Sequence, residues 1–395
     1  MMPVNFFAEI NMEFDIVING GGLVGASLAA ALRSSGLKIA LIEGQALPGL
    51  DSEWDSRIYA FTPGNVDFLK ELGAWQRMDQ SRVQQVEEMR VFGDTGAELD
   101  FSAYQVGAPE LAFILESRLL QHALWQGLGE QENLTILQPA QCAELSIDDD
   151  AARLKLKDGR EIKTRLIVGA DGRDSWVRNQ TLMPEVPTPY FQHGVVANFT
   201  TGKAHRGIAY QWFSPEGILA LLPLPGKRIS IVWSVSPEKS AELLALTPAE
   251  LCAQVAAASK HTLGELQVIT PPASFALRVL NLAHLTKPRL ALIGDAAHNI
   301  HPLSGHGVNL GLRDAQQLAQ VLLQRGTQDC GDLALLRRYE RARQGDIMSM
   351  QLTTDTLKNL FVNDNPLLRT LRNLGLAATN KLVPLKKMMV RHALT

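Results

Sequence analysis

The sequence predicts an α/β fold with a discontinuous Rossmann-like domain, an antiparallel-sheet domain and a C-terminal helical extension. Three observations support this prediction. A strand, a glycine-rich turn, a helix and a second strand follow one another near the N-terminus. Two later strands each end in a turn that contains an Asp, and the middle of the chain has short segments of alternating polarity. The first two are typical of dinucleotide-binding folds, and the third of antiparallel sheets.

Composition excludes several classes of protein. The chain has 395 residues, of which 46% are hydrophobic and 20% charged, with a formal net charge of −3. This balance is typical of a globular protein and argues against a nucleic-acid binder. The cysteines Cys142, Cys252 and Cys330 have no zinc-site or disulfide spacing, which fits a reducing cytoplasm. Neither a signal-peptide pattern nor a long apolar run is present, so we expect a cytoplasmic protein.

The N-terminal motif begins with a short β-branched run, Ile16–Ile18, which predicts a buried parallel strand. Three glycines follow in a G-x-G-x-x-G arrangement. The Ala- and Leu-rich stretch 23–32 then predicts a helix, and the stretch 37–43 predicts a second strand. Glycines set between a strand and a helix in this order predict a dinucleotide-binding unit.

The chemistry of this motif depends on Gly20, Gly22, Gly25 and Glu43. Gly20 allows the tight turn, Gly22 allows the backbone to approach a pyrophosphate, and Gly25 allows close packing of helix and strand. The helix N-terminus faces the phosphate charge. Glu43 ends the second strand, where a carboxylate accepts both hydroxyls of an adenosine ribose. We therefore predict FAD or NAD rather than NADP as the bound dinucleotide.

Two further strand ends favour FAD over NAD. Strand 166–168 is followed by Asp171–Gly172, and strand 290–293 is followed by Gly294–Asp295. A long ligand lying across several strand ends would need such turns, whereas an NAD fold needs only the first glycine motif. The sequence thus predicts FAD.

Together these motifs resemble the class A flavin-dependent aromatic hydroxylases, the para-hydroxybenzoate hydroxylase superfamily. Several other stretches resemble the ubiquinone-biosynthesis ring hydroxylases within that superfamily. The similarity extends from Phe14 to Leu394 in the family's order. The motifs that carry it are GGGLVG, ADGRDSWVR and GDAAHNIHPLSGHGVNLGLRD, and the other stretches include 56–75, 113–125, 217–225, 231–238 and 336–343.

The resemblance implies a set of cofactor-binding residues. Asp295 would contact the ribityl and pyrophosphate part of FAD, and the stretch 302–307 would lie along the isoalloxazine edge. The helix that begins at Val308–Asn309 would face the pyrimidine side of the flavin, where reduced flavin carries negative charge. The expected residues are Gly20, Gly22, Gly25, Glu43, Arg57, Arg118, Asp171, Gly172, Gly294, Asp295, Pro302, Gly305, Gly307, Val308 and Asn309.

Polar residues near the third motif leave the acid–base chemistry open. Asn19 stands where the family carries a small or apolar residue, and we expect little effect from it. His306 stands where the family often has Gln, and it is a candidate for titration near the flavin; a purely backbone role is the alternative. We interpret His298 and His301 as structural or solvent-facing. Their spacing fixes no ligand geometry, so no metal site is predicted.

The implied activity is hydroxylation of the aromatic ring of a polyprenylated phenol in ubiquinone biosynthesis. NAD(P)H would reduce FAD, and O₂ would form a flavin C4a-hydroperoxide that transfers oxygen to the ring. The protein would have to hold the ring and exclude water. Three other hypotheses stay open: a hydroxylase of a small soluble phenol, a flavin-dependent reductase of lipid double bonds, and a non-catalytic FAD-fold protein.

The middle of the chain is expected to cover the flavin. We predict an FAD-binding domain from 12–75, 111–185 and 276–330, a substrate-binding sheet domain from 76–110 and 186–275, and a helical region from 331–395. Phe213, Leu219, Leu221 and Leu222 are candidates to line a path for an apolar substrate, or else belong to the core of the sheet.

The last stretch of the chain is basic. No acidic residue follows Asp364. A solvent-exposed helix and a basic amphipathic element that rests on anionic lipid both fit this pattern. The second interpretation would place the protein at the inner face of the membrane. Other quinone-biosynthesis enzymes are partners implied by the resemblance. The basic residues are Arg369, Arg372, Lys381, Lys386, Lys387 and Arg391.

Overall fold

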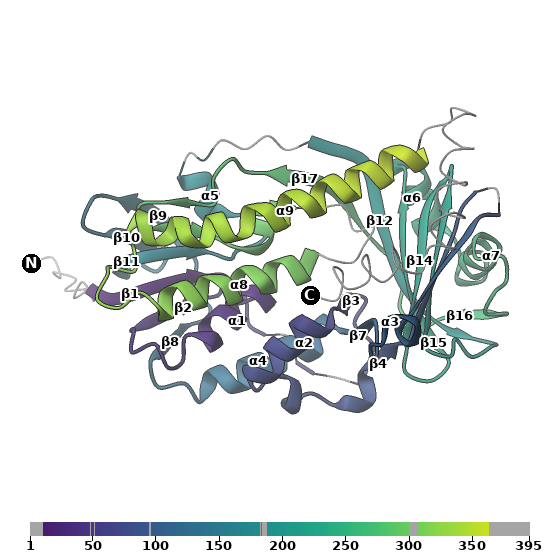
Figure 1. Ribbon diagram of the computed structural model, residues 1–395, viewed down its shortest axis with the longest axis horizontal. Coiled ribbons are helices and arrows are strands. Elements are labelled where there is room, and N and C mark those ends of the chain that lie inside the picture. Colours follow the sequence, from purple (N-terminus) through teal and green to yellow (C-terminus); the bar gives the residue numbers. More distant parts are fainter. Residues whose placement is uncertain are drawn as a thin grey trace, which may run out of the picture.

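The computed structural model contains two large β-sheets, a small third sheet and helices that cover them (Figure 1). The first large sheet and the second lie at opposite ends of the molecule in Figure 1. The predicted α/β fold class, with a Rossmann-like part and an antiparallel sheet, is confirmed. The structure describes residues 11–47, 49–50, 52–94, 96–181, 183, 188–299 and 307–362.

The first sheet has a parallel centre of order β19-β11-β1-β2-β8. Its middle residues, such as Ile16 and its partners Leu166 and Ile39, are fully buried, as is usual for a parallel sheet that is covered on both faces. Antiparallel strands β18, β10 and β9 complete it. The strands are β1 (Asn11–Asn19), β2 (Ile39–Ile42), β8 (Leu134–Leu137), β9 (Cys142–Ile147), β10 (Ala152–Leu156), β11 (Glu161–Gly169), β18 (Thr286–Lys287) and β19 (Leu290–Leu292).

The helices of this part pack around α1, which contacts both α4 and α8. The long helix α9 lies along α8 and extends toward the β12 end of the second sheet (Figure 1). No helix of the described residues is long and apolar enough to cross a membrane. The elements are α1 (Leu23–Ala31), α2 (Pro63–Glu71), η1 (Trp75–Arg77), η2 (Gln80–Arg82), α4 (Ser117–Gly129), α5 (Trp176–Gln180), η3 (Gly294–Ala296), α8 (Gly307–Leu323) and α9 (Leu333–Val362).

The second sheet runs β20-β17-β12-β15-β14-β13-β5-β6, with β16 beside β12. A three-stranded sheet, β3-β7-β4, lies between it and the first sheet (Figure 1). The elements are β3 (Ile58–Phe61), β4 (Gln84–Val86), β5 (Glu88–Phe92), β6 (Glu98–Ser102), α3 (Ala103–Val106), β7 (Ala112–Glu116), β12 (Thr188–Thr201), β13 (Ile208–Ser214), β14 (Gly217–Leu224), β15 (Arg228–Val235), α6 (Pro237–Ala245), α7 (Pro248–Ala258), β16 (Leu266–Val268), β17 (Ala273–Asn281) and β20 (His298–Asn299).

The second sheet has two different faces. Leu219 and Leu221 belong to a core that includes residues of α6 and α7, on the outer face. The sheet-core interpretation is therefore confirmed for these two residues. Leu222 packs instead with Ile58 and Trp54, on the inner face, which looks toward the first sheet. Phe213 belongs to a smaller cluster with residues of β5 and β6.

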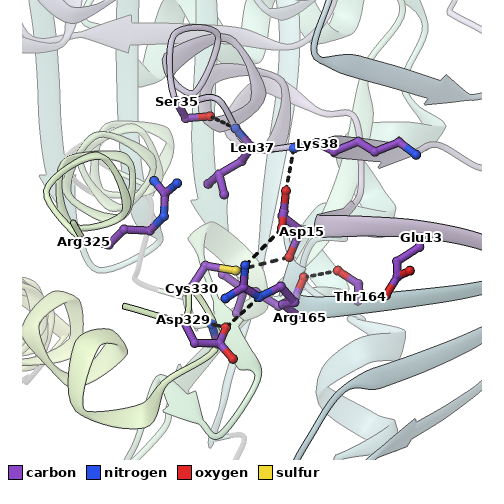
Figure 2. Close-up of polar contacts among 12 residues, drawn as sticks. Glu13, Asp15, Ser35, Leu37, Lys38, Thr164, Arg165, Arg325, Asp329 and Cys330 are labelled. Carbon is purple, nitrogen blue, oxygen red and sulfur yellow. Dashed lines mark hydrogen bonds and ion pairs between the residues drawn. The ribbon is translucent and has the colours of Figure 1, made fainter. Parts of the chain in front are cut away.

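An ion-pair cluster lies at the middle of β1 and β11, where the parallel centre of the first sheet begins (Figure 2). Arg165 pairs with Asp15 and with Asp329. The buried thiol of Cys330 donates to the carbonyl of Asp15, 3.3 Å away. This cluster ties the segment before α9 to β1 and β11, far from the glycine-rich turns at the carboxyl edge. We assign it a structural role.

The division into domains remains a proposal, which the sheets support. The strands of the first sheet fall within 12–75, 111–185 and 276–330, apart from Asn11. The strands of the second sheet fall mainly within 76–110 and 186–275. Helix α9 occupies 333–362 of the proposed helical region, and the basic tail from Arg369 to Arg391 lies outside the described residues.

Candidate functional site

The three predicted turns lie side by side at one edge of the first sheet. They follow β1, β11 and β19, which are neighbouring parallel strands. Backbone hydrogen bonds continue beyond the strands, from Ala170 N to Asn19 O at 2.8 Å and from Ile293 N to Gly169 O at 3.0 Å. Ligands of open α/β sheets bind outside the carboxyl ends of the strands. The turns therefore form one continuous edge for a long ligand.

Two glycines of the first motif are required by the packing of the chain itself. Gly20 has φ +109°, a backbone conformation that side chains disfavour. A Cβ at Gly25 would lie 2.0 Å from the carbonyl oxygen of Gly20, so only glycine lets α1 approach β1 this closely. Gly311 has the same role between α8 and α1, because a Cβ there would lie 2.6 Å from Val24 Cγ2.

Gly22 and Gly307 have no such internal cause, since a Cβ at either position would meet no atom of the described residues within 4 Å. A Cβ at Gly172 would also meet none of them, but its φ of +80° favours glycine. Gly22 has φ −66°, which any residue adopts, and it begins α1 without a side-chain cap or an acidic residue in the first turn. An uncapped helix N-terminus beside open space suits an anionic group such as a pyrophosphate. The residues present thus fit an FAD lying across the three turns.

Glu43 lies directly after β2 and organises the first turn. Its Oε2 accepts the backbone N–H of Gly21 at 2.8 Å, and its Oε1 accepts the N–H of Gln45 at 3.0 Å. The indole of Trp125 in α4 donates to the carbonyl of Gly21, also at 2.8 Å. A carboxylate oxygen accepts more than one hydrogen bond, so Glu43 keeps acceptor capacity for ribose hydroxyls.

The carboxylate of Asp171 is largely occupied by hydrogen bonds from neighbouring residues of the protein. Its Oδ2 accepts the backbone N–H groups of Trp176 and Val177 at 2.8 and 3.1 Å. The same oxygen accepts Nδ2 of Asn19 at 3.0 Å, and Oδ1 accepts the hydroxyl of Ser175. Asp171 therefore fixes the second turn against the first. Its predicted contact with cofactor remains a proposal.

Asp295 is the least satisfied carboxylate of the edge. Its side chain is exposed, and no hydrogen bond to it is found among the described residues. Burial nevertheless raises the pKa of Asp295, since protein atoms surround the carboxylate closely. Burial also raises the pKa of Tyr59, and the charge of Asp295 adds to that rise. An exposed but closely surrounded acceptor suits the hydroxyl donors of a ribityl chain.

The two predicted arginines meet at Asp55. Oδ1 of Asp55 accepts the backbone N–H of Arg57 at 3.0 Å, and Oδ2 accepts that of Arg118 at 3.2 Å. The side chain of Arg57 is 59% exposed, whereas that of Arg118 donates to the carbonyl of Glu53 at 3.0 Å. Arg57 is thus available to a ligand, and Arg118 shapes the loop that carries it.

Asn309 holds the start of α8 in place through three hydrogen bonds. Its Oδ1 accepts Thr62 N at 3.0 Å and Asn65 Nδ2 at 2.9 Å, and its Nδ2 donates to Ala60 O at 2.7 Å. Its buried side chain therefore joins the start of α8 to the segment between β3 and α2. The residues expected along the flavin edge, Pro302, Gly305 and His306, lie outside the described residues, as does His301.

A buried charge network stabilises the third turn. Asp314 in α8 accepts Nε2 of His298 at 2.6 Å, Nε of Arg343 at 2.7 Å and the backbone N–H of Gly294 at 2.9 Å. Burial would raise the pKa of Asp314, but His298 and Arg343 keep it below its usual value. The position of Asp295 therefore depends indirectly on α8 and α9.

Three contacts of the site were not predicted from the sequence. Arg178 donates to the carbonyls of Ala296 and Arg173 at 3.0 and 2.9 Å, and so ties the second turn to the third. Asn19, from which little effect was expected, contacts Asp171. Arg178 and Asp314 stand within the quoted motifs, but the local sequence does not specify their partners.

Comparisons with known proteins agree with this geometry. A family model described as an FAD binding domain matches residues 13–352. Ubiquinone hydroxylase UbiL of Rhodospirillum rubrum is 35% identical, with 96% of this chain and 89% of that protein covered. The 3-demethoxyubiquinol 3-hydroxylase of Escherichia coli is 34% identical, with 97% and 99% covered.

Solved structures show the same fold. A probable FAD-dependent monooxygenase of Pseudomonas aeruginosa, pqsL, has a TM-score of 0.78 at 23% identity, covering 93% of this chain and 100% of its own. A single-residue variant of HpxO from Klebsiella pneumoniae, solved in complex with FAD, has a TM-score of 0.75 at 17% identity, covering 96% and 99%.

Proposed function

The chain belongs to the family of FAD binding domain monooxygenases, and on that premise we propose that it hydroxylates the aromatic ring of a polyprenylated phenol in ubiquinone biosynthesis. Its relatives are named hydroxylases and monooxygenases and cover most of the chain. FAD is the cofactor, and NAD(P)H and O₂ are the reductant and oxidant typical of this class.

FAD supplies the redox chemistry and the oxygen transfer when it is bound. We propose that the chain's own residues hold and surround it. The N-termini of α1 and α8 face its phosphates and its ring, Glu43 accepts ribose hydroxyls, and Asp295 accepts ribityl hydroxyls. Arg57 supplies a positive charge. A phenol ring is already electron-rich, so no protein nucleophile is required.

The inner face of the second sheet carries the proposal on substrate class. Val196, Val232 and Ala220 face one another across β12, β15 and β14. Val232 and Ala220 are partly exposed, as is Leu222 beside them. These side chains bear no charge, so the face suits an apolar-substituted ring better than a carboxylate-bearing one. This observation favours a prenylated phenol over a small soluble acid.

Membrane contact is a further part of the proposal. We propose that the protein is cytoplasmic and that the basic tail, with Lys386 and Lys387, rests on the anionic inner face of the membrane, where a polyprenylated substrate is dissolved. Other enzymes of quinone biosynthesis are proposed partners. The support for the tail is its charge pattern alone.

Deletion of the gene in its host tests the proposed function. We expect a polyprenylated phenol that lacks one ring oxygen to accumulate, identified by mass spectrometry of extracted lipids. The wild-type gene on a plasmid should restore the quinone. An unchanged quinone pool in a strain without a second copy would contradict the proposal, and accumulation of an unreduced lipid would favour a double-bond reductase.

A further inference from the structure

Two buried polar atoms on the inner face of the second sheet have no hydrogen-bond partner in the described part of the chain. They are Oδ1 of Asn198 and Oγ of Ser230. Asn198 is 0% exposed and Ser230 1% exposed, so water does not reach them. A buried polar atom left unpaired costs about 1–3 kcal/mol. Native proteins retain few such atoms, and each calls for a physical explanation.

The two atoms belong to one row of side chains. Asn198 in β12 lies opposite Ser230 in β15, and Ser230 lies opposite Leu222 in β14. Residues directly opposite in antiparallel strands share a face, with Cβ atoms about 4.5–5.5 Å apart. Leu222 packs against Trp54 and Ile58 of the FAD-binding part. The pair therefore points toward that part and away from the core under α6 and α7.

The amide of Asn198 has a fixed orientation. Its Nδ2 donates to the carbonyl oxygen of Asp55 at 2.8 Å. A carbonyl oxygen only accepts, so the amide cannot be reversed, and Oδ1 must be the unpaired acceptor. The side chain of Asp55 binds the backbone of Arg57 and of Arg118. The side chain that carries the unpaired acceptor therefore binds the loop at Asp55, and this loop contains Arg57, which is predicted to contact FAD.

The surroundings of the pair are apolar. The next row along the same face consists of Val196, Val232 and Ala220. An acceptor and a hydroxyl beside a partly exposed apolar surface match one chemical group in particular, a hydroxyl on an aromatic ring. Such a hydroxyl donates to Asn198 Oδ1 and accepts from Ser230 Oγ, while the ring and its apolar substituent cover the valines.

We propose that Asn198 and Ser230 form the polar subsite that binds the phenolic hydroxyl of the substrate and orients its ring toward the flavin. This inference rests on the proposed function and specifies how the same site recognises its substrate. Both atoms are shielded from solvent, so the hydroxyl reaches them together with a rearrangement of the side chains that cover them. In the complex both unpaired atoms gain partners.

Binding of a matched pair of probes tests the subsite. The probes are a phenol with a geranyl chain in the ortho position and its O-methyl ether, which cannot donate a hydrogen bond. Their affinities for the FAD-loaded protein are measured from the change in flavin absorbance. Ser230→Ala removes one hydroxyl, Asn198→Ala removes the acceptor, and Ser234→Ala is the control, because Ser234 is a buried serine on the same strand and face.

The subsite predicts a specific pattern. Asn198→Ala should weaken binding of the phenol about threefold to tenfold, the loss of one neutral hydrogen bond, and leave the ether unchanged, because the ether has no proton to donate to Oδ1. Ser230→Ala should weaken binding of both probes, because the oxygen of either one accepts from the serine hydroxyl. Ser234→Ala should change neither affinity. Ser230→Ala should also raise the melting temperature, since an unpaired buried hydroxyl is removed, and FAD affinity should stay the same.

Three results would distinguish failure of the subsite from failure of the proposed function. Equal affinities for both probes in the wild type, unchanged in Asn198→Ala, would overturn the subsite, even if the wild type hydroxylates the phenol. Equal weakening of both probes in Asn198→Ala would also overturn it, because it would indicate a structural role. A wild-type protein that neither binds the phenol nor forms a hydroxylated product would contradict the proposed function, and the subsite with it.

Discussion

The carboxylate of Asp314 accepts a hydrogen bond from Nε2 of His298 across 2.6 Å, with both side chains almost completely buried. Asp314 also binds Arg343 of α9 and the backbone of Gly294. One carboxylate thus connects the turn that carries Asp295 to two helices. A buried charge of this kind is tolerated only while its partners stay in place.

Replacement of Asp314 by Asn should destabilise the protein strongly. The change removes the fully buried partner of Arg343 and leaves it only the partly exposed Asp346, which costs about 3–5 kcal/mol of unfolding free energy. Urea denaturation followed by circular dichroism measures it. Asp67→Asn, which affects an exposed pair with Lys70, is the control and should shift stability by less than about 0.5 kcal/mol. Equal stabilities of the two variants would refute this role of Asp314.

The carboxylate of Asp314 should also make the stability of the protein depend on pH in the acidic range. The pKa of Asp314 is below its ordinary value of 3.8, so its stabilising contribution is complete above that value. The contribution is lost as the pH falls through the lowered pKa. The wild type should therefore lose stability steeply below about pH 4, and Asp314→Asn should show a smaller loss. Thermal melts across acidic pH values compare the two slopes; parallel slopes would speak against the assignment.

Gly22 and Gly25 should respond differently to alanine. A Cβ at Gly25 would lie 2.0 Å from a carbonyl oxygen, so Gly25→Ala should fold poorly. A Cβ at Gly22 would meet nothing within 4 Å, so Gly22→Ala should keep its melting temperature within a few degrees, an alanine N-cap costing about 1 kcal/mol or less. Its FAD affinity should fall at least about tenfold, because the new methyl group occupies the space next to the helix N-terminus. Unchanged FAD affinity in Gly22→Ala would place the pyrophosphate elsewhere.

Asp295→Asn should raise the stability of the flavin-free protein and lower its affinity for FAD. Burial raises the pKa of Asp295, so its ionised form opposes folding of the flavin-free protein, and the penalty grows as the pH rises above 3.8. At pH 7 the flavin-free variant should melt at a higher temperature than the flavin-free wild type. FAD affinity should drop about tenfold to a hundredfold, the loss of hydrogen bonds to a charged acceptor. A variant that melts lower and binds FAD normally would show that Asp295 has only a structural role.

The thiols should differ in reactivity. Burial raises the pKa of Cys142 and of Cys330 to about 12, so neither is a thiolate near neutral pH. Cys252 is only partly buried. Iodoacetamide at pH 8 should label Cys252 in the native protein and all three cysteines after unfolding, as peptide mass spectrometry can show. Cys252→Ser should then show little native labelling; rapid labelling of Cys330 would mean that the segment before α9 opens.

Local patterns in the sequence predicted the elements of the site well. The glycine spacing predicted the turn after β1 because Gly20 needs a positive φ and Gly25 needs close packing, and both needs are local. The ends of the strands predicted the edge of the sheet at which the turns of Asp171 and Asp295 lie. Sequence spacing alone is enough for such features, because parallel strands align their carboxyl ends.

Long-range polar contacts could not be predicted from the sequence, because no local pattern of residues specifies them. The contact of Asn19 with Asp171 joins residues 152 positions apart. The bond from Asn198 to Asp55 spans 143 positions and joins the second sheet to the FAD-binding part. Arg178 was visible as part of the second motif, but its partner at Ala296 depends on the tertiary fold. Likewise, the sequence did not predict which face of the second sheet Leu219 and Leu222 occupy, because this depends on the register of the strands.

We propose that this protein inserts an oxygen atom into the ring of a prenylated phenol. The most direct test is to incubate the FAD-loaded protein with NAD(P)H, the ortho-geranyl phenol and isotopically labelled O₂, and to analyse the product by mass spectrometry. We predict a product with one additional labelled oxygen atom on the ring. Consumption of NAD(P)H with an unchanged phenol, or a product with a reduced double bond and no label, would contradict the account.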